Sequence, residues 1–181
     1  LSGATDSCWG VFSLPVGTGT VANATIGAPT GTANAQLSLS NTLFKVTGSL
    51  TLRQTAQVAV SVGAGSAALD VRGSFVDEGG SLSASFLDVP APGGLIWALR
   101  VAGDQRGTLN GMVDAGRLTA TTAAPDGYRV GVIYDSDQDV TMYALADEEL
   151  FDSDIIVQVR ETLTVTKAAD IDVTIGVADI D

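Results

Sequence analysis

The sequence of 181 residues contains no histidine and a single cysteine, Cys8. The absence of histidine removes the usual general base of enzymes and the commonest ligand of transition metals. A lone cysteine excludes a disulfide within the chain. Only two tryptophans and three tyrosines occur, too few for the aromatic-lined cleft of a typical glycoside hydrolase. We therefore expect no catalytic residues, and no enzymatic activity.

Long apolar runs and basic clusters are also missing. No stretch approaches the roughly 20 apolar residues of a membrane helix, so we expect no membrane span. Nine basic residues stand against 21 acidic ones, and the net charge is −12. Binding to phosphate groups needs a basic face, so nucleic acid is not an expected partner. Glycine-rich stretches at 17–22 and 63–68 lack the amphipathic helix that a dinucleotide site requires, so we expect no organic cofactor.

The charges that do occur are unevenly placed. Residues 135–181 carry a net charge of −11, whereas no acid or base occurs from Ser7 to Phe44. A chargeless stretch with β-prone runs favours burial on both faces. We interpret 1–36 as an uncharged N-terminal arm, which either packs in its own domain or adds as a strand to a neighbouring subunit. Residues 37–181 are then a single β-sandwich domain with an acidic C-terminal third.

Alternation of apolar and polar residues dominates the chain, as in "QVAVSV" at 57–62. A period of two is typical of half-buried strands. Turn clusters such as "DEGG", "APGG" and "AGDQRG" separate roughly ten to twelve such runs. The pattern predicts an all-β fold, an antiparallel β-sandwich resembling a jelly roll. The one expected helical turn is "ALADEELF" at 144–151, which reads equally well as an acidic loop.

The chain contains an internal sequence repeat. At a constant offset of 113, residues 37–63 align with 150–176, and eight of the 27 positions are identical. Each copy has a long strand, a five-residue connector and a short strand, which predicts a repeated hairpin. The apolar series breaks at Gly48 in one copy and at Glu161 in the other. A break at equivalent places predicts a bulge.

The best candidate for a metal site is "YDSDQDV". Its Asp135, Asp137 and Asp139 alternate as the oxygen ligands of a calcium loop do. Val140 and Ala146 replace the glycine and the bidentate glutamate of an EF-hand, so any calcium site is of another kind. A solvated acidic loop is the alternative interpretation.

These observations favour a non-enzymatic structural subunit of an extracellular filament or surface assembly, joined by β-strand addition. Its partners are then other copies of itself or other subunits of the assembly, and calcium is its possible cofactor. The start at Leu1 fits a processed N-terminus, and "NAT" at Asn23 fits a glycosylation acceptor on an exported protein. Two alternatives stay open. One is a virion protein, such as a capsid decoration or tail component, and the other is a carbohydrate- or surface-binding module that uses loops 86–95 or 135–154.

Overall fold

The computed structural model describes residues 10–14, 17–31, 34–63 and 68–151 of the chain. These residues form fourteen strands and one helix. In chain order they are β1 (Gly10–Leu14), β2 (Gly17–Val21), β3 (Ala24–Ile26), β4 (Ala35–Ser40), β5 (Thr42–Val46), β6 (Leu50–Arg53), β7 (Ala56–Val62), β8 (Leu69–Val71), β9 (Phe75–Glu78), β10 (Ser81–Phe86), β11 (Leu95–Ala102), α1 (Arg106–Asp114), β12 (Leu118–Ala120), β13 (Tyr128–Asp135) and β14 (Val140–Asp147).

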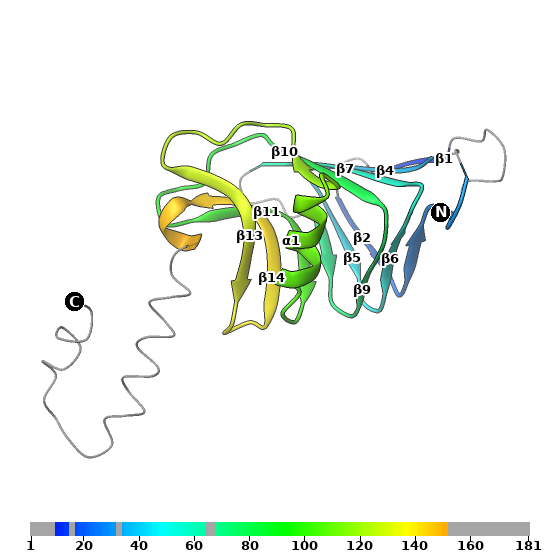
Figure 1. The fold of residues 1–181 in the computed structure, drawn as a ribbon. Helices are drawn as coiled ribbons and strands as arrows, with labels where there is room; N and C mark the ends of the chain where they lie inside the picture. Colours follow the sequence, from blue (N-terminus) through cyan, green and yellow to red (C-terminus); the bar gives the residue numbers. More distant parts are fainter. Residues whose placement is uncertain (1–9, 15–16, 32–33, 64–67, 152–181) are drawn as a thin grey trace, which may run out of the picture.

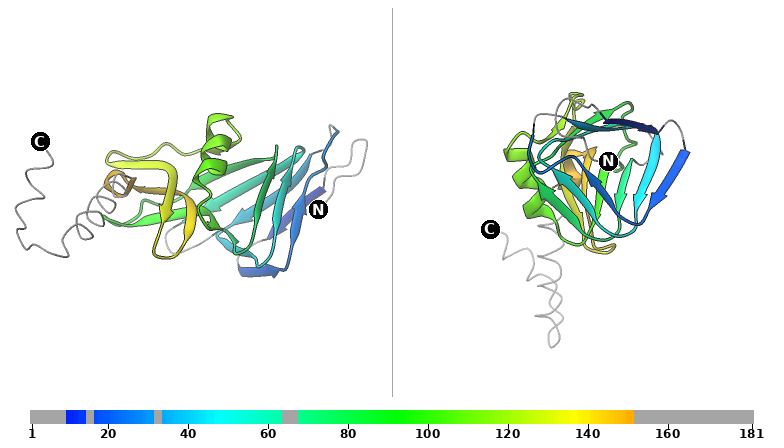
Figure 2. Two further views of the ribbon diagram at one scale, coloured as in Figure 1. Left: turned by 60° about the horizontal axis from the view of Figure 1, so that its bottom comes forward. Right: turned by 90° about the vertical axis from the view of Figure 1, so that its right-hand side faces the viewer.

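The strands belong to three sheets, and from β1 to β9 successive strands along the chain belong to the three sheets in a repeating order. Their orders are β1-β4-β7-β10-β12, β13-β14-β11-β8-β5-β2 and β3-β6-β9. Each strand from β1 to β8 pairs in parallel with the strand one circuit further along the chain. The chain therefore winds around a common core as a parallel β-solenoid, with one strand in each sheet per coil (Figures 1 and 2).

The predicted antiparallel β-sandwich is wrong. Only the β11–β14 and β13–β14 pairs are antiparallel, among the strands that the structure describes. The connector "RQTAQ" joins β6 to β7, but these two strands lie in different sheets and do not pair. The segment 37–63 thus runs along one coil of the solenoid and the first strand of the next, β7, rather than forming a hairpin. Its partner in the predicted repeat, 150–176, lies beyond the described residues except for 150 and 151.

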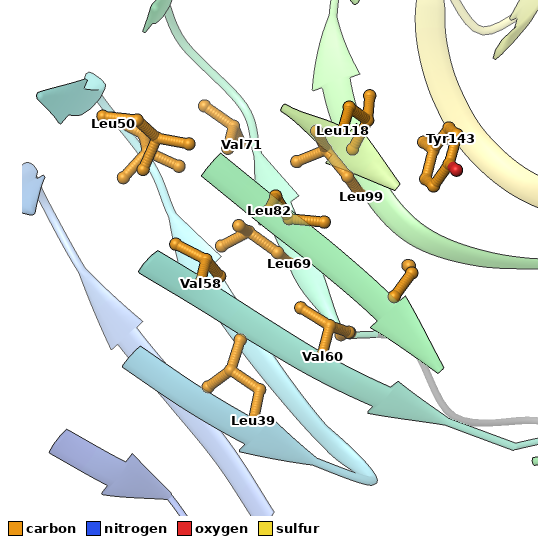
Figure 3. Close-up of a cluster of buried hydrophobic side chains, with 14 of the residues drawn as sticks. Leu39, Leu50, Val58, Val60, Leu69, Val71, Leu82, Leu99, Leu118 and Tyr143 are labelled. Atoms are coloured by element: carbon orange, nitrogen blue, oxygen red, sulfur yellow. The ribbon is translucent and has the colours of Figure 1, made fainter. Parts of the chain in front are cut away.

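Alternation gives each strand one face toward the core. In β4, β7 and β10 the buried residues occupy every second position. Paired strands of successive coils are in register, so the buried residues of one coil lie directly beside those of the next. Figure 3 shows Leu39, Val58, Val60 and Leu82 projecting from these strands into the shared interior. Each such aliphatic side chain contributes about 1.5–3 kcal/mol when it is fully buried. The stacked rows therefore supply most of the energy that holds the coils together.

The corner between β5 and β6 is a site of close backbone approach. A Cβ atom on Gly48 would overlap Oδ1 of Asn23 and lie 2.7 Å from the carbonyl oxygen of Ala22 in the preceding coil. One coil further on, a Cβ on Gly73 would overlap the carbonyl oxygen of Gly48. The interrupted pattern at Gly48 marks this corner, not the bulge that the sequence predicted.

Beyond the third coil the pattern changes. Helix α1 follows β11 and precedes β12, in the place where earlier coils have a strand of the β3-β6-β9 sheet. Its Leu109 and Met112 are fully buried. The β13–β14 hairpin extends the six-stranded sheet, and the helical turn that the sequence placed at 144–151 is confined to 148–151. Across the described ranges, no helix is both long and apolar enough to cross a membrane.

Candidate functional site

The first coil forms one end of the solenoid. Strands β1, β2 and β3 are each the last strand of their sheet, and all three belong to this coil. Figure 1 shows the first coil at one end of the molecule and the β13–β14 hairpin toward the other. We call the outer edges of β1, β2 and β3 the open end. A strand in this position presents backbone groups along its outer side, where another chain can pair.

The backbone of β2 shows which groups face outward. The carbonyl oxygen of Val21 accepts a hydrogen bond from the Thr47 N–H at 3.0 Å, so Val21 faces the second coil. Backbone groups of successive residues in a strand point to opposite sides. The N–H and C=O groups of Thr18 and Thr20 therefore point away from β5, toward the open end. Both of these residues are exposed.

A pocket of about 230 Å³ lies beside β2 and β3. Val21, Ala24 and Ile26 of the first coil line it together with Leu37 and Phe44 of the second coil. Asn23 and Thr25 also line it, so the lining is mainly apolar and includes side chains of the core cluster. Its volume is below the roughly 300–1,000 Å³ of sites for drug-sized molecules. Aliphatic side chains of an added strand match its size and chemistry better than a cofactor does.

Two of the described strands at this end, β2 and β3, lack common features that discourage pairing. Natural proteins guard exposed edges with charged side chains or proline. Neither occurs in "GTGTV" of β2 or "ATI" of β3. At the adjoining corner, Oδ1 of Asn23 accepts hydrogen bonds from N–H and Oγ of Ser49, at 2.8 and 3.0 Å. The corner is thus fixed to the second coil, and the edge is held in a shape that another strand can extend.

The predicted calcium ligands lie in the tight turn of the β13–β14 hairpin, away from the open end. Oδ1 of Asp135 accepts hydrogen bonds from the N–H groups of Asp137 and Gln138, and its Oδ2 accepts one from Nε2 of Gln138. Asp139 has a φ of 51° and accepts a hydrogen bond from the Tyr134 hydroxyl. Within the described part of the chain, no three acidic, cysteine or histidine side chains are grouped to hold a metal ion. Calcium binding here stays a prediction.

Among the described residues, the most buried charged group is Asp70 on β8. Its carboxylate accepts two hydrogen bonds from Arg100 on β11, at 2.9 and 3.0 Å, and one from Nε of Arg72 at 3.0 Å. Burial alone would raise the pKa of Asp70, but the hydrogen bonds and charges of Arg100 and Arg72 outweigh it and lower that pKa. A carboxylate held ionised between two guanidinium groups links neighbouring coils. It offers no free base for catalysis.

A second pocket of about 190 Å³ lies under loop 87–94, one of the loops that a binding module would use. Leu87, Val89, Val130 and Leu145 contribute to its lining, and its aromatic residue, Phe86, is only 4% exposed. Carbohydrate sites need exposed rings for stacking, and this pocket presents none from the described residues. The open end is therefore the stronger candidate.

Sequence reasoning reached the open end only indirectly. The uncharged stretch from Ser7 to Phe44 contains β2 and β3, but the burial on both faces that it predicted is not seen in β2, where Thr18 and Thr20 are exposed. These strands pair on one side with the second coil of their own chain. Whether their outer side meets another subunit stays a prediction. Cys8 lies outside the described residues.

The chain matches no protein-family model, no curated protein and no solved structure.

Proposed function

We propose that the protein is a non-enzymatic structural subunit that polymerises by β-strand addition, in an extracellular filament or a surface assembly. The observation that carries this proposal is the open end, where the terminal strands β2 and β3 border a mainly apolar pocket. Strand addition there continues the ladders of the solenoid and covers apolar side chains at the same time. An interface that joins one end of a subunit to a different part of the next gives an open filament when its rotation does not close into a ring.

The size distribution of the full-length chain tests the proposal. We expect sedimentation velocity to show species larger than the monomer that grow with protein concentration, and negative-stain images to show filaments. The variant Thr20→Pro removes an outward N–H of β2 and places a ring on the open edge. The hydrogen bonds between β2 and β5 involve Val21 and every second residue before it, and not Thr20. The substitution therefore leaves these bonds in place. Thr20→Pro should therefore stay monomeric and folded.

Thr20→Ala is the matched control, since it removes the same side chain but keeps the N–H. It should assemble as the unchanged protein does. A full-length protein that is monomeric at every concentration, or a Thr20→Pro variant that still assembles, contradicts the proposal. Circular dichroism of both variants establishes that each is folded.

The extracellular or cell-surface location is part of the same proposal, and a virion location is its alternative. Both places use the same open end, so fractionation of the source material separates them. Antibody labelling on intact cells supports the first location, whereas recovery with purified particles that contain packaged nucleic acid supports the second.

A further inference from the structure

We infer that the open end of one subunit receives residues 155–166 of a second copy of the chain. This inference rests on the proposed function, because it names the partner of the same open end. We call 155–166, "IIVQVRETLTVT", the donor segment. It begins four residues after the last described residue, Phe151. In the proposed complex it pairs in parallel with β2 and β3, in the same way that β2 and β3 pair with β5 and β6 of their own chain.

The donor segment repeats the residue pattern of β5, its corner and β6. At the offset of 113, the inward residues of those strands have aliphatic counterparts throughout, and outward Lys45, Thr51 and Arg53 have polar ones, whereas outward Leu43 corresponds to Ile156. The inward residues Phe44, Val46, Leu50 and Leu52 are at most 7% exposed. Their counterparts are Val157, Val159, Leu163 and Val165, while Lys45 and Thr51 correspond to Gln158 and Thr164.

The corner explains the one position where the donor segment departs from that pattern. Gly48 corresponds to Glu161. In each of the two stacked corners, a Cβ atom would run into the backbone of the preceding coil, so a side chain is excluded there. A coil added beyond β2 and β3 has no preceding coil on its outer side. Glutamate is therefore compatible with a corner that has no coil before it.

Chain length shows that the donor comes from a second copy. The Phe151 ring lies 4.1 Å from the guanidinium carbon of Arg129 on β13, which is the far edge of the six-stranded sheet. A strand beyond β2 would lie at least five strand spacings from β14, about 24 Å. The four residue steps from 151 to 155 span at most about 14 Å. The same chain cannot reach its own open end in this register.

The first coil sets the length of the donor segment. In a continuing spiral, the strand after β6 belongs to the sheet of β1, one coil further on. The counterpart of that strand in the donor, 169–175, would thus fall in the row that β1 already occupies. Addition is therefore limited to two strands and the corner between them, beside β2 and β3.

Charge favours this head-to-tail arrangement. Residues 135–181 carry a net charge of −11, whereas residues 1–69 carry a net charge of +1. Joining two C-terminal regions would bring their acids together, whereas joining a C-terminal region to an open end separates them. Electrostatic repulsion thus acts against the reverse polarity.

Full-length variants of the donor segment test the inference. Leu163→Lys places a charge at the counterpart of fully buried Leu50, whereas Thr164→Lys places the same charge at an outward position. We expect Leu163→Lys to abolish assembly in sedimentation velocity and Thr164→Lys to retain it. Leu163→Lys still has an intact open end, and Thr20→Pro still has an intact donor segment. An equimolar mixture of these two monomers should therefore form 1:1 complexes and nothing larger.

The outcomes separate this inference from the proposed function. If Leu163→Lys assembles normally while Thr20→Pro does not, the open end is used but residues 155–166 are not its partner. Equal loss of assembly in Leu163→Lys and Thr164→Lys overturns the register. A mixture that stays monomeric also overturns the inference. If the unchanged protein is monomeric at every concentration, the proposed function fails as well.

Discussion

The corner where Asn23, Gly48 and Gly73 stack makes a sharp prediction about stability. We expect Gly73→Ala to destabilise the solenoid, because the added Cβ would overlap the carbonyl oxygen of Gly48 and lie 2.8 Å from its carbonyl carbon. Both atoms belong to the backbone of the neighbouring coil. No side chain can rotate away to make room, so the two coils must separate at this corner.

The expected magnitude follows from these contacts. Overpacking of a well-packed site costs about 1–3 kcal/mol, and a backbone neighbour places this site toward the upper part of that range. The change from glycine to alanine also restricts the unfolded chain, which offsets the cost by about 0.5 kcal/mol. We therefore expect Gly73→Ala to lower the free energy of unfolding by about 2 kcal/mol. At about 2–4 °C per kcal/mol for a chain of this size, the Tm falls by about 4–8 °C.

Urea denaturation followed by circular dichroism measures this change, with thermal melting as a second assay. Gly111→Ala is the matched control, because a Cβ on Gly111 of α1 meets no atom within 4 Å. Removing a glycine from a helix should raise the stability by about 1 kcal/mol. If Gly73→Ala is as stable as the unchanged protein, the corner tolerates a side chain. The argument that places Glu161 at the end of a stack then fails too.

Three further predictions concern other sites. Because the folded pKa of Asp70 is lowered, its contribution to stability is full above the unfolded pKa of about 3.9 and is lost as the pH falls through the folded pKa. Asp70→Asn should lower the free energy of unfolding by about 3 kcal/mol at neutral pH, since Arg100 is left without its ion pair. Urea titrations of this variant should also show a weaker loss of stability at acid pH. An unchanged dependence of stability on pH would contradict the role given to Asp70. Asn23→Ala removes the acceptor for Ser49 and should lower the stability by about 1 kcal/mol, measured by the shift of the urea midpoint. If the predicted calcium site exists, calcium raises the Tm and Asp137→Ala abolishes the rise; an identical Tm with and without a chelator would end that idea.

The positions of the strands could be predicted from the sequence, but their partners could not. "QVAVSV" and "YRVGVIY" lie in β7 and β13, since alternation is a local property of a half-buried strand. The same alternation occurs in parallel and antiparallel sheets. The strands that pair are separated by one coil of the solenoid, which is much shorter than the offset of 113. One coil separates Ala35 from its partner Ala56 by 21 residues, whereas it separates Phe44 from its partner Leu69 by 25. Unequal spacing hides a repeat from a search at one fixed offset.

Helix α1 was missed for a different physical reason. "RGTLNGMVD" contains two glycines, and "AGDQRG", which predicts a turn, overlaps its first two residues. Glycine in a helix costs about 1 kcal/mol relative to alanine, so the local sequence argues against a helix. Burial of Leu109 and Met112 in the core overrides that preference. Such tertiary effects are not visible in a single sequence.

The sequence located the candidate site without its geometry. The absence of charge from Ser7 to Phe44 predicted a covered surface, and the strands β2 and β3 of the open end lie within this stretch. The sequence did not show that β2 and β3 have one side paired and one side open, because that depends on the order of strands in the sheets. The alternating acids Asp135, Asp137 and Asp139 were predicted as calcium ligands. In the structure, two of their carboxylates accept hydrogen bonds from the hairpin.

The most direct test of head-to-tail strand addition is a disulfide between copies. The register places Gln158 of the donor segment beside Thr20 of β2, at about the 4.8 Å spacing of neighbouring strands, which suits a disulfide. In a Cys8→Ser background, a mixture of Gln158→Cys and Thr20→Cys chains should form this cross-link under mild oxidation, as identified by mass spectrometry. Gln158→Cys with Thr18→Cys, about 8 Å apart in the same register, should not. Equal cross-linking of both pairs, or of neither, would contradict the account.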